Sequence, residues 1–190
     1  MIRDYALWPL PDAWEEAAPI QEGTAMYWEC SGLVELLDEE ANGEFCLLEL
    51  LSVLFAEPLT LYSSGWSEET LTIIAEGKVI DDQHRNGNGR MTLLRPVEDG
   101  FELWFYRQGE LFRLDLDVPG YLHRLCQTRG MYDWQLFFAD PAHLARSQTL
   151  DGIAGAIPHL RFIAVALPVL FPGTDTADYH AICKALTQRC

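Results

Sequence analysis

Two pairs of possible metal ligands occur at the same spacing in the second half of the chain, His123-x-x-Cys126 and His180-x-x-Cys183. Residues three apart share one face of a helix, so each pair would present an imidazole and a thiol side by side. If the two helices faced each other, the four side chains would suit a tetrahedral zinc ion. The order of the ligands and the long interval between the pairs match no common zinc motif, which argues against a metal site.

The segment HRNGNGR at 84–90 contains a Gly-x-Gly sequence of the kind found in phosphate-binding loops. It has no third glycine, no Lys-Ser/Thr and no evident helix after it, so we expect a turn between strands. The serines of YSSGW at 62–66 stand in no Gly-x-Ser-x-Gly elbow and also indicate a turn.

Several carboxylates and one histidine could form a hydrolytic cluster, although no spacing fixes their geometry: Asp81, Asp82, His84, Asp115 and Asp117. No motif supports catalysis, so we expect a protein that is not an enzyme and needs no cofactor. A small metal-dependent or nucleotide-binding enzyme that uses residues 81–90 or the two His/Cys pairs is the alternative.

The composition predicts a compact cytoplasmic protein. A hydrophobic fraction of 49% in 190 residues can bury a proper core, and we expect one domain over residues 1–190. The five cysteines are scattered without a CxxC pair, which is typical of free thiols in a reducing compartment. The longest apolar run, at 160–171, is too short to cross a bilayer, and no targeting segment is visible.

The formal charge of −16 is distributed unevenly. Residues 1–82 carry 18 acidic side chains and only Arg3 and Lys78, whereas residues 83–190 are neutral overall. Such a field repels nucleic acid and anionic membranes and attracts basic protein surfaces. A basic protein partner is therefore expected, although acidity can also serve solubility alone. Mimicry of DNA by carboxylates is a further possibility, which the neutral second half weakens.

The pattern of apolar and turn residues predicts an α+β fold. Residues 91–117 read as a meander of three antiparallel strands, with the turns EDG and QGE between them. Before it we expect a helix at 32–41 that ends at Asn42-Gly43, a helix at 46–55, a strand near 59–62 and a strand at 69–80.

After the meander the chain is expected to be helical. Asp117 can cap a helix whose first turn contains Pro119 and which ends at Gly130, and the aromatic run at 131–138 would form a second helix packed on the sheet. A short helix at 149–156, a buried segment interrupted by Pro158 and Pro168, and a closing helix at 175–189 should follow. We expect four residues of the closing helix to dock on the domain: Ala177, Ile182, Ala185 and Leu186.

A set of residues near the end of the meander carries a family resemblance: Tyr121-Leu122, Leu125, Arg129-Gly130, Trp134-Gln135, Phe137-Phe138 and Asp140. After a strand meander and an acidic N-terminal part with LPDAW and ANGEF, this pattern resembles the Smi1/Knr4-like (SUKH) superfamily. The resemblance implies a sheet backed by helices, and many bacterial members of the superfamily are immunity proteins that bind and neutralise a toxin. It implies no catalytic residues.

The binding surface must then come from exposed residues of this chain. We expect an acidic interface to a basic toxin, made of Glu35, Asp38, Glu39, Glu68 and Glu69, with Trp66 as an apolar anchor. The alternative is that these carboxylates form a solvated helix face and that Trp66 belongs to the core.

Overall fold

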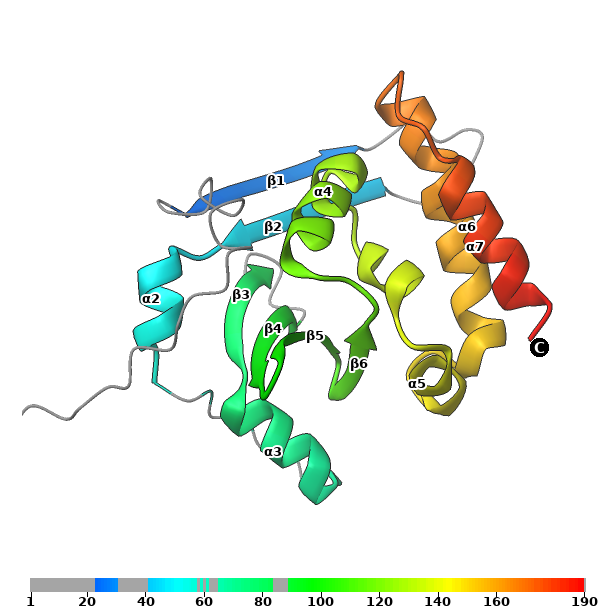
Figure 1. The fold of residues 1–190 in the computed structure, drawn as a ribbon. Helices are drawn as coiled ribbons and strands as arrows, with labels where there is room; N and C mark the ends of the chain where they lie inside the picture. Colours follow the sequence, from blue (N-terminus) through cyan, green and yellow to red (C-terminus); the bar gives the residue numbers. More distant parts are fainter. Residues whose placement is uncertain are drawn as a thin grey trace, which may run out of the picture.

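The structure is a computed structural model that describes residues 23–30, 41–57, 59, 61, 65–83 and 89–189, without the side chains of Leu50, Leu51 and Leu54. Its centre is a six-stranded antiparallel sheet with the strands in sequence order (Figure 1). The strands are β1 (Thr24–Cys30), β2 (Ala41–Leu47), β3 (Lys78–Gln83), β4 (Arg90–Val97), β5 (Gly100–Arg107) and β6 (Glu110–Leu114). The helices are α2 (Leu50–Phe55), α3 (Glu68–Glu76), α4 (Val118–Thr128), the 3₁₀ helix η2 (Trp134–Phe138), α5 (Pro141–Arg146), α6 (Gly152–Leu170) and α7 (Ala177–Thr187).

The predicted α+β fold and its meander are confirmed. Strands β4, β5 and β6 pair in continuous antiparallel register, and the turn into β6 contains Gln108 and Gly109 with φ of 48° and 91°. In β6, Phe112 and Leu114 are buried while Arg113 is exposed, as the alternating pattern predicts.

Helices cover both faces of this sheet. The larger core lies between one face and the helices α4, η2, α6 and α7, whereas α3 packs on the opposite face (Figure 1). Adjacent residues on each central strand belong to different cores. Leu94 of β4 and Leu103 of β5 belong to the larger core, whereas Leu93 of β4 and Trp104 of β5 belong to the smaller one. The central strands β4 and β5 are therefore buried on both sides.

The predicted strand at 69–80 is wrong, because most of it forms helix α3. The Oγ of Ser67 accepts a hydrogen bond from the N–H of Thr70 at 3.1 Å, and Glu68 and Glu69 occupy the first turn, where acidic side chains favour a helix. The adjacent Ile73 and Ile74 are buried against the sheet. The β-branched residues that suggested a strand thus form the apolar face of a capped helix.

Residues 41–55 also differ from the prediction, since the first half is a strand and only the second half is the helix α2. Asn42 and Gly43 do not end a helix but lie inside β2, where Gly43 pairs with Trp28 of β1. The remainder of the predicted helix at 32–41 is outside the described residues. Of the predicted strand near 59–62, only residues 59 and 61 are described, and neither is in a strand.

The helix α4 follows the prediction closely. The carboxylate of Asp117 accepts a hydrogen bond from the N–H of Gly120 at 2.7 Å, and Pro119 occupies the first turn. The helix ends at Arg129 and Gly130, whose φ values of 55° and 66° turn the chain sharply toward the aromatic segment. That segment packs as expected, with Trp134 fully buried, but as one turn of 3₁₀ helix.

The C-terminal third needs two corrections. Helix α6 runs without a break through Pro158 and Pro168, because burial of its apolar residues against the core outweighs the lost backbone hydrogen bonds. The closing helix α7 docks through Tyr179, Cys183 and Leu186, with Ile182 half-buried. The predicted contacts Ala177 and Ala185 are instead exposed.

Helix α6 is long and apolar enough to cross a membrane by length and composition, contrary to the expectation from its apolar run alone. Residues 152–159, which are small or apolar apart from His159, lengthen the helix to 19 residues. Seven of its residues are buried against the core, and the core helix of a soluble protein has the same composition. This helix is therefore weak evidence for a membrane span.

The pairing of β1 with β2 depends on a close approach that only glycine allows. A Cβ atom at Gly43 would lie 2.6 Å from the indole ring of Trp28. We predict that Gly43→Ala lowers the free energy of unfolding by about 1–3 kcal/mol, the usual cost of overpacking. Urea denaturation measures this loss.

Gly65→Ala is the matched control, because no atom lies within 4 Å of the added carbon. It should leave the unfolding free energy nearly unchanged. Equal losses in the two variants would contradict the proposed steric cause.

Candidate functional site

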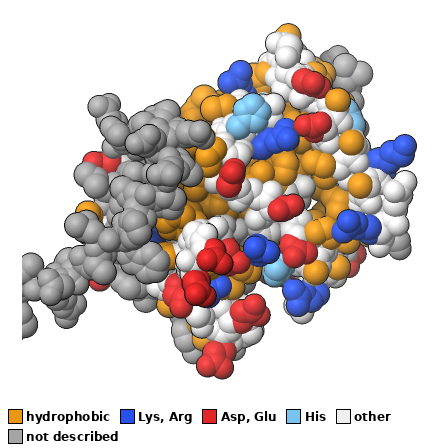
Figure 2. Space-filling model, in the orientation of Figure 1, with side chains coloured by type: hydrophobic (Ala, Val, Ile, Leu, Met, Phe, Trp, Pro, Cys, Tyr) orange, Lys and Arg blue, Asp and Glu red, His pale blue; other side chains and the backbone are white. Residues whose placement is uncertain are grey.

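The outer face of α3 is the most acidic helical surface among the described residues. We define the α3 outer face by its exposed residues, Glu68, Glu69, Leu71, Thr72, Ala75 and Glu76. Glu68 and Glu69 form no ion pair with any described residue, whereas Glu76 binds Arg95 at 2.8 Å. In the space-filling view, acidic side chains gather over this helix at the lower end of the molecule (Figure 2).

The described residues predicted for the interface take different positions. Glu68 and Glu69 lie exposed on the α3 outer face as expected. Trp66 is half-buried: its indole Nε1 donates to the carbonyl oxygen of Gly109 at 2.7 Å, and its ring packs edge-on against Tyr106. It therefore fixes the start of α3 to the β5–β6 turn. The other three predicted residues, Glu35, Asp38 and Glu39, lie outside the described residues.

A polar cleft of about 230 Å³ lies between the start of α3, the β5–β6 turn and α5. Glu110 in this cleft accepts hydrogen bonds from the hydroxyls of Ser147 and Thr149. Burial alone would raise the pKa of Glu110, but these hydrogen bonds hold it below its usual range. Burial lowers the pKa of His143 across the cleft. The Glu110 carboxylate is therefore engaged in hydrogen bonds within the protein and is not available as a general base.

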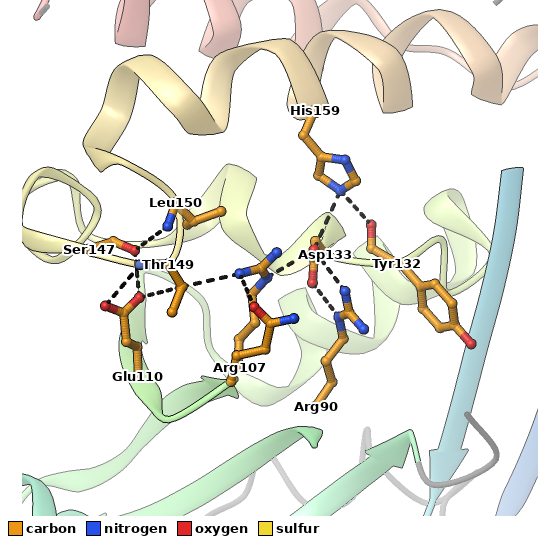
Figure 3. Close-up of polar contacts among 10 residues, drawn as sticks. Arg90, Arg107, Glu110, Tyr132, Asp133, Ser147, Thr149, Leu150 and His159 are labelled. Carbon is orange, nitrogen blue, oxygen red and sulfur yellow. Dashed lines mark hydrogen bonds and ion pairs between the residues drawn. The ribbon is translucent and has the colours of Figure 1, made fainter. Parts of the chain in front are cut away.

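A buried ion cluster joins the sheet to the helical layer (Figure 3). The carboxylate of Asp133 accepts hydrogen bonds from Nε of Arg90 at 2.6 Å and from Nε of Arg107 at 3.0 Å. His159 of α6 approaches the same carboxylate, with 3.6 Å between Nε2 and Oδ2. Burial would raise the pKa of Asp133, but the two arginines outweigh it and keep the pKa below its usual range.

A second buried network joins β3 to α4. The carboxylate of Asp81 accepts hydrogen bonds from the hydroxyl of Tyr121 at 2.7 Å and from the N–H of Cys46 at 2.8 Å. Tyr121 also contacts the hydroxyl of Thr92 and the amide nitrogen of Gln135. Burial raises the pKa of Asp81 to about 6 despite these hydrogen bonds, because the charged form is poorly solvated.

The sequence-predicted chemical clusters do not assemble in the described part of the chain. His123 and Cys126 line the surface of α4, whereas His180 and Cys183 line a separate hollow beside α6. No group of three or more His, Cys, Asp or Glu residues that could hold a metal ion occurs among the described residues. Asp117 serves as a helix cap rather than joining Asp81.

The Gly-x-Gly segment connects β3 to β4, and residues 84–88 lie outside the description. Strand β4 follows this segment at Arg90, as the prediction of a turn between strands requires. The segment therefore does not lead into a helix N-terminus of the kind that binds phosphate. His84 also falls outside the described residues.

Comparisons with protein-family models, with curated proteins and with solved structures find no match to this chain.

Sequence reasoning missed both buried polar networks. The pairing of Asp133 with Arg90 and Arg107 joins segments far apart in the chain, and local spacing carries no sign of it. A partial signal existed for Asp81, since an acidic residue directly follows the apolar pair Val79-Ile80. An apolar groove beside α4 was also missed.

Asp81 should make stability depend on pH. In the folded protein its pKa is about 6, against 3.8 for an ordinary aspartate, so the folded state holds this proton more tightly. The resulting stability is complete below about pH 4 and is lost as the pH rises through about 6. The variant Asp81→Asn cannot ionise at this position, so it does not lose this stability as the pH rises. The unfolding free energy of the variant minus that of the parent protein should therefore increase by about 2 kcal/mol between pH 4 and pH 7.

Urea unfolding at several pH values measures this difference. Asp115→Asn, at an exposed aspartate directly after β6, is the matched control for the loss of one carboxylate. A pH-independent difference for Asp81→Asn, or the same pH dependence in both variants, would contradict the assigned role.

Proposed function

We propose that this chain is a cytoplasmic binding protein that neutralises a cognate basic protein toxin by covering it with an acidic surface. The observation that carries the proposal is the α3 outer face, where Glu68 and Glu69, which form no ion pair with a described residue, lie with the exposed Leu71 on one firmly held helix. Neutralisation by occlusion needs no catalytic group in the binding protein.

The charges of the α3 outer face are suited to steering a basic partner. Glu102, a half-exposed carboxylate of the sheet, is engaged with Arg95 and Arg113. Glu68 and Glu69 form no ion pair with any described residue, and Glu69 borders the polar cleft that contains His143. Complementary charge accelerates association and disfavours acidic competitors.

The same face offers an apolar contact at one edge. Leu71 is 40% exposed, although a leucine is usually buried, and it lies one turn beyond Glu68. Ile73 and Ile74 pin the helix to the sheet from the other side, and Trp66 fixes its start. A rigid helix that carries one apolar residue among charges loses little conformational entropy on binding.

The SUKH resemblance supports the scaffold half of the proposal. Its residues Tyr121, Leu125, Trp134 and Phe137 are all buried under the sheet, where they fix α4 and η2. Residues that build a shared core say nothing about which surface meets the partner. The choice of α3 therefore depends on the surface of this chain alone.

The first test is affinity capture from cells that express the chain and its neighbouring genes, at low and moderate salt, followed by mass spectrometry. We expect one basic protein in near-equal amount, whose toxicity is abolished when this chain is co-expressed. Retention of no basic protein, or undiminished toxicity of the one retained, would overturn the proposal.

With that partner, the double variant Glu68→Gln/Glu69→Gln should slow association roughly three- to tenfold at low salt and flatten its salt dependence. Leu71→Ala should chiefly speed dissociation. Stopped-flow kinetics separate the two effects.

Glu98→Gln/Asp99→Gln is the matched control, since it removes the same charge from the exposed β4–β5 turn. It should change association much less. If both double variants slow association equally, net charge rather than the α3 outer face governs binding.

A further inference from the structure

An apolar groove of about 560 Å³ lies between the β1–β2 hairpin and α4. Its walls are mainly apolar and come from two strands and one helix: Met26, Phe45, Leu47, Pro119, Leu122 and Leu125. The elements that form it, β1, β2 and α4, lie toward the upper end of the molecule, whereas α3 lies at the lower end (Figure 1). Its volume falls within the range of small-molecule sites.

The groove exists because the hairpin diverges from the rest of the sheet. Strand β2 pairs with β1 along seven residues but with β3 at the single pair Leu47 and Asp81. Beyond that pair, the neighbour of β2 on this side is the segment after α4, through the bridge between Gly43 and Met131. Between these two points, Phe45 and Leu47 line the groove opposite α4.

Hydrogen bonds at the end of α4 fix β1 and β2 to the helix. The indole Nε1 of Trp28 donates to the carbonyl oxygen of Arg129 at 2.7 Å, and the N–H of Glu44 donates to the carbonyl oxygen of Gly130 at 2.9 Å. Gly130 fits closely, because a Cβ there would meet Glu44 and Phe45 at 3.0 Å. The groove is thus preformed, and filling it need not cost a rearrangement.

Arg129 stands at the edge of this groove and forms no ion pair with any described residue. Among the described residues, five arginines pair with carboxylates: Arg90, Arg95, Arg107, Arg113 and Arg124. The side chain of Arg129 lines this groove and the adjacent hollow that contains Asp175, and it makes no hydrogen bond or ion pair with a described residue. Its guanidinium lies over the ring of Phe171, at 5.9 Å from the ring centre.

We propose that this groove binds an amphiphile with an unbranched apolar chain and a single carboxylate. The chain would contact Phe45, Leu47 and Leu122, and the carboxylate would accept hydrogen bonds from the guanidinium of Arg129. Arginine presents two parallel N–H groups that match a carboxylate, and such charge-assisted bonds are among the strongest. A cationic amphiphile would instead be repelled by the same residue.

Decanoate, used below its micelle concentration, is the probe for the full-length chain. Isothermal titration should give one saturable site, with affinity at least about tenfold higher than for decanol, because the alcohol has the same chain but no charge. Decyltrimethylammonium should bind more weakly still. Equal affinity for the three compounds, or no saturable binding of decanoate, would overturn the proposal.

Arg129→Gln should reduce the affinity for decanoate to that for decanol and leave decanol binding unchanged. Arg161→Gln is the control, since Arg161 is an exposed arginine of α6 that lines a different hollow. Met26→Trp, at a partly exposed position on β1, should fill the groove and weaken both ligands without unfolding the protein. Unchanged decanoate affinity in Arg129→Gln or in Met26→Trp would show that the ligand binds elsewhere.

Discussion

A single buried carboxylate connects the two layers of this protein. Asp133 lies between α4 and η2, with a left-handed backbone at φ of 63°, and its side chain binds Arg90 of β4 and Arg107 of β5. Two arginines buried without it would be strongly unfavourable, so the corner after α4 can dock on the sheet in only one position. The aromatic residues of η2 and the long helix α6 then pack around this corner.

The buried network at Asp81 and Tyr121 fixes the other end of α4. Together with the Asp133 cluster, the side chains of Asp81 and Tyr121 hold α4 rigidly across one face of the sheet. Helix α4, which ends in the turn at Arg129 and Gly130, also forms one wall of the apolar groove. The opposite face is free to carry α3, whose buried isoleucines need only a shallow apolar surface around Leu93 and Trp104.

This arrangement separates the two proposed binding surfaces. The α3 outer face is acidic and convex, which suits a macromolecule, whereas the groove is apolar and concave with a cation at its edge, which suits a small ligand. The unequal charge of the sequence places most carboxylates in the first part of the chain, and α3 lies in that part. Arg129 lies in the neutral second part of the chain.

Local patterns in the sequence determined the elements whose signals lie within a few residues of one another. The meander follows from alternating side chains between turn residues, and the cap of α4 follows from Asp117 and Pro119. Composition and charge placement likewise predicted the acidic residues of α3, although not the helix that carries them. Where β-branched residues lie in a capped helix, as in α3, or where prolines lie in a buried one, as in α6, packing against distant segments overrode local preference. Only the tertiary structure decided that Asp133 meets Arg90 and Arg107, and that the divergence of β2 from β3 leaves a groove, because both depend on which distant segments approach one another.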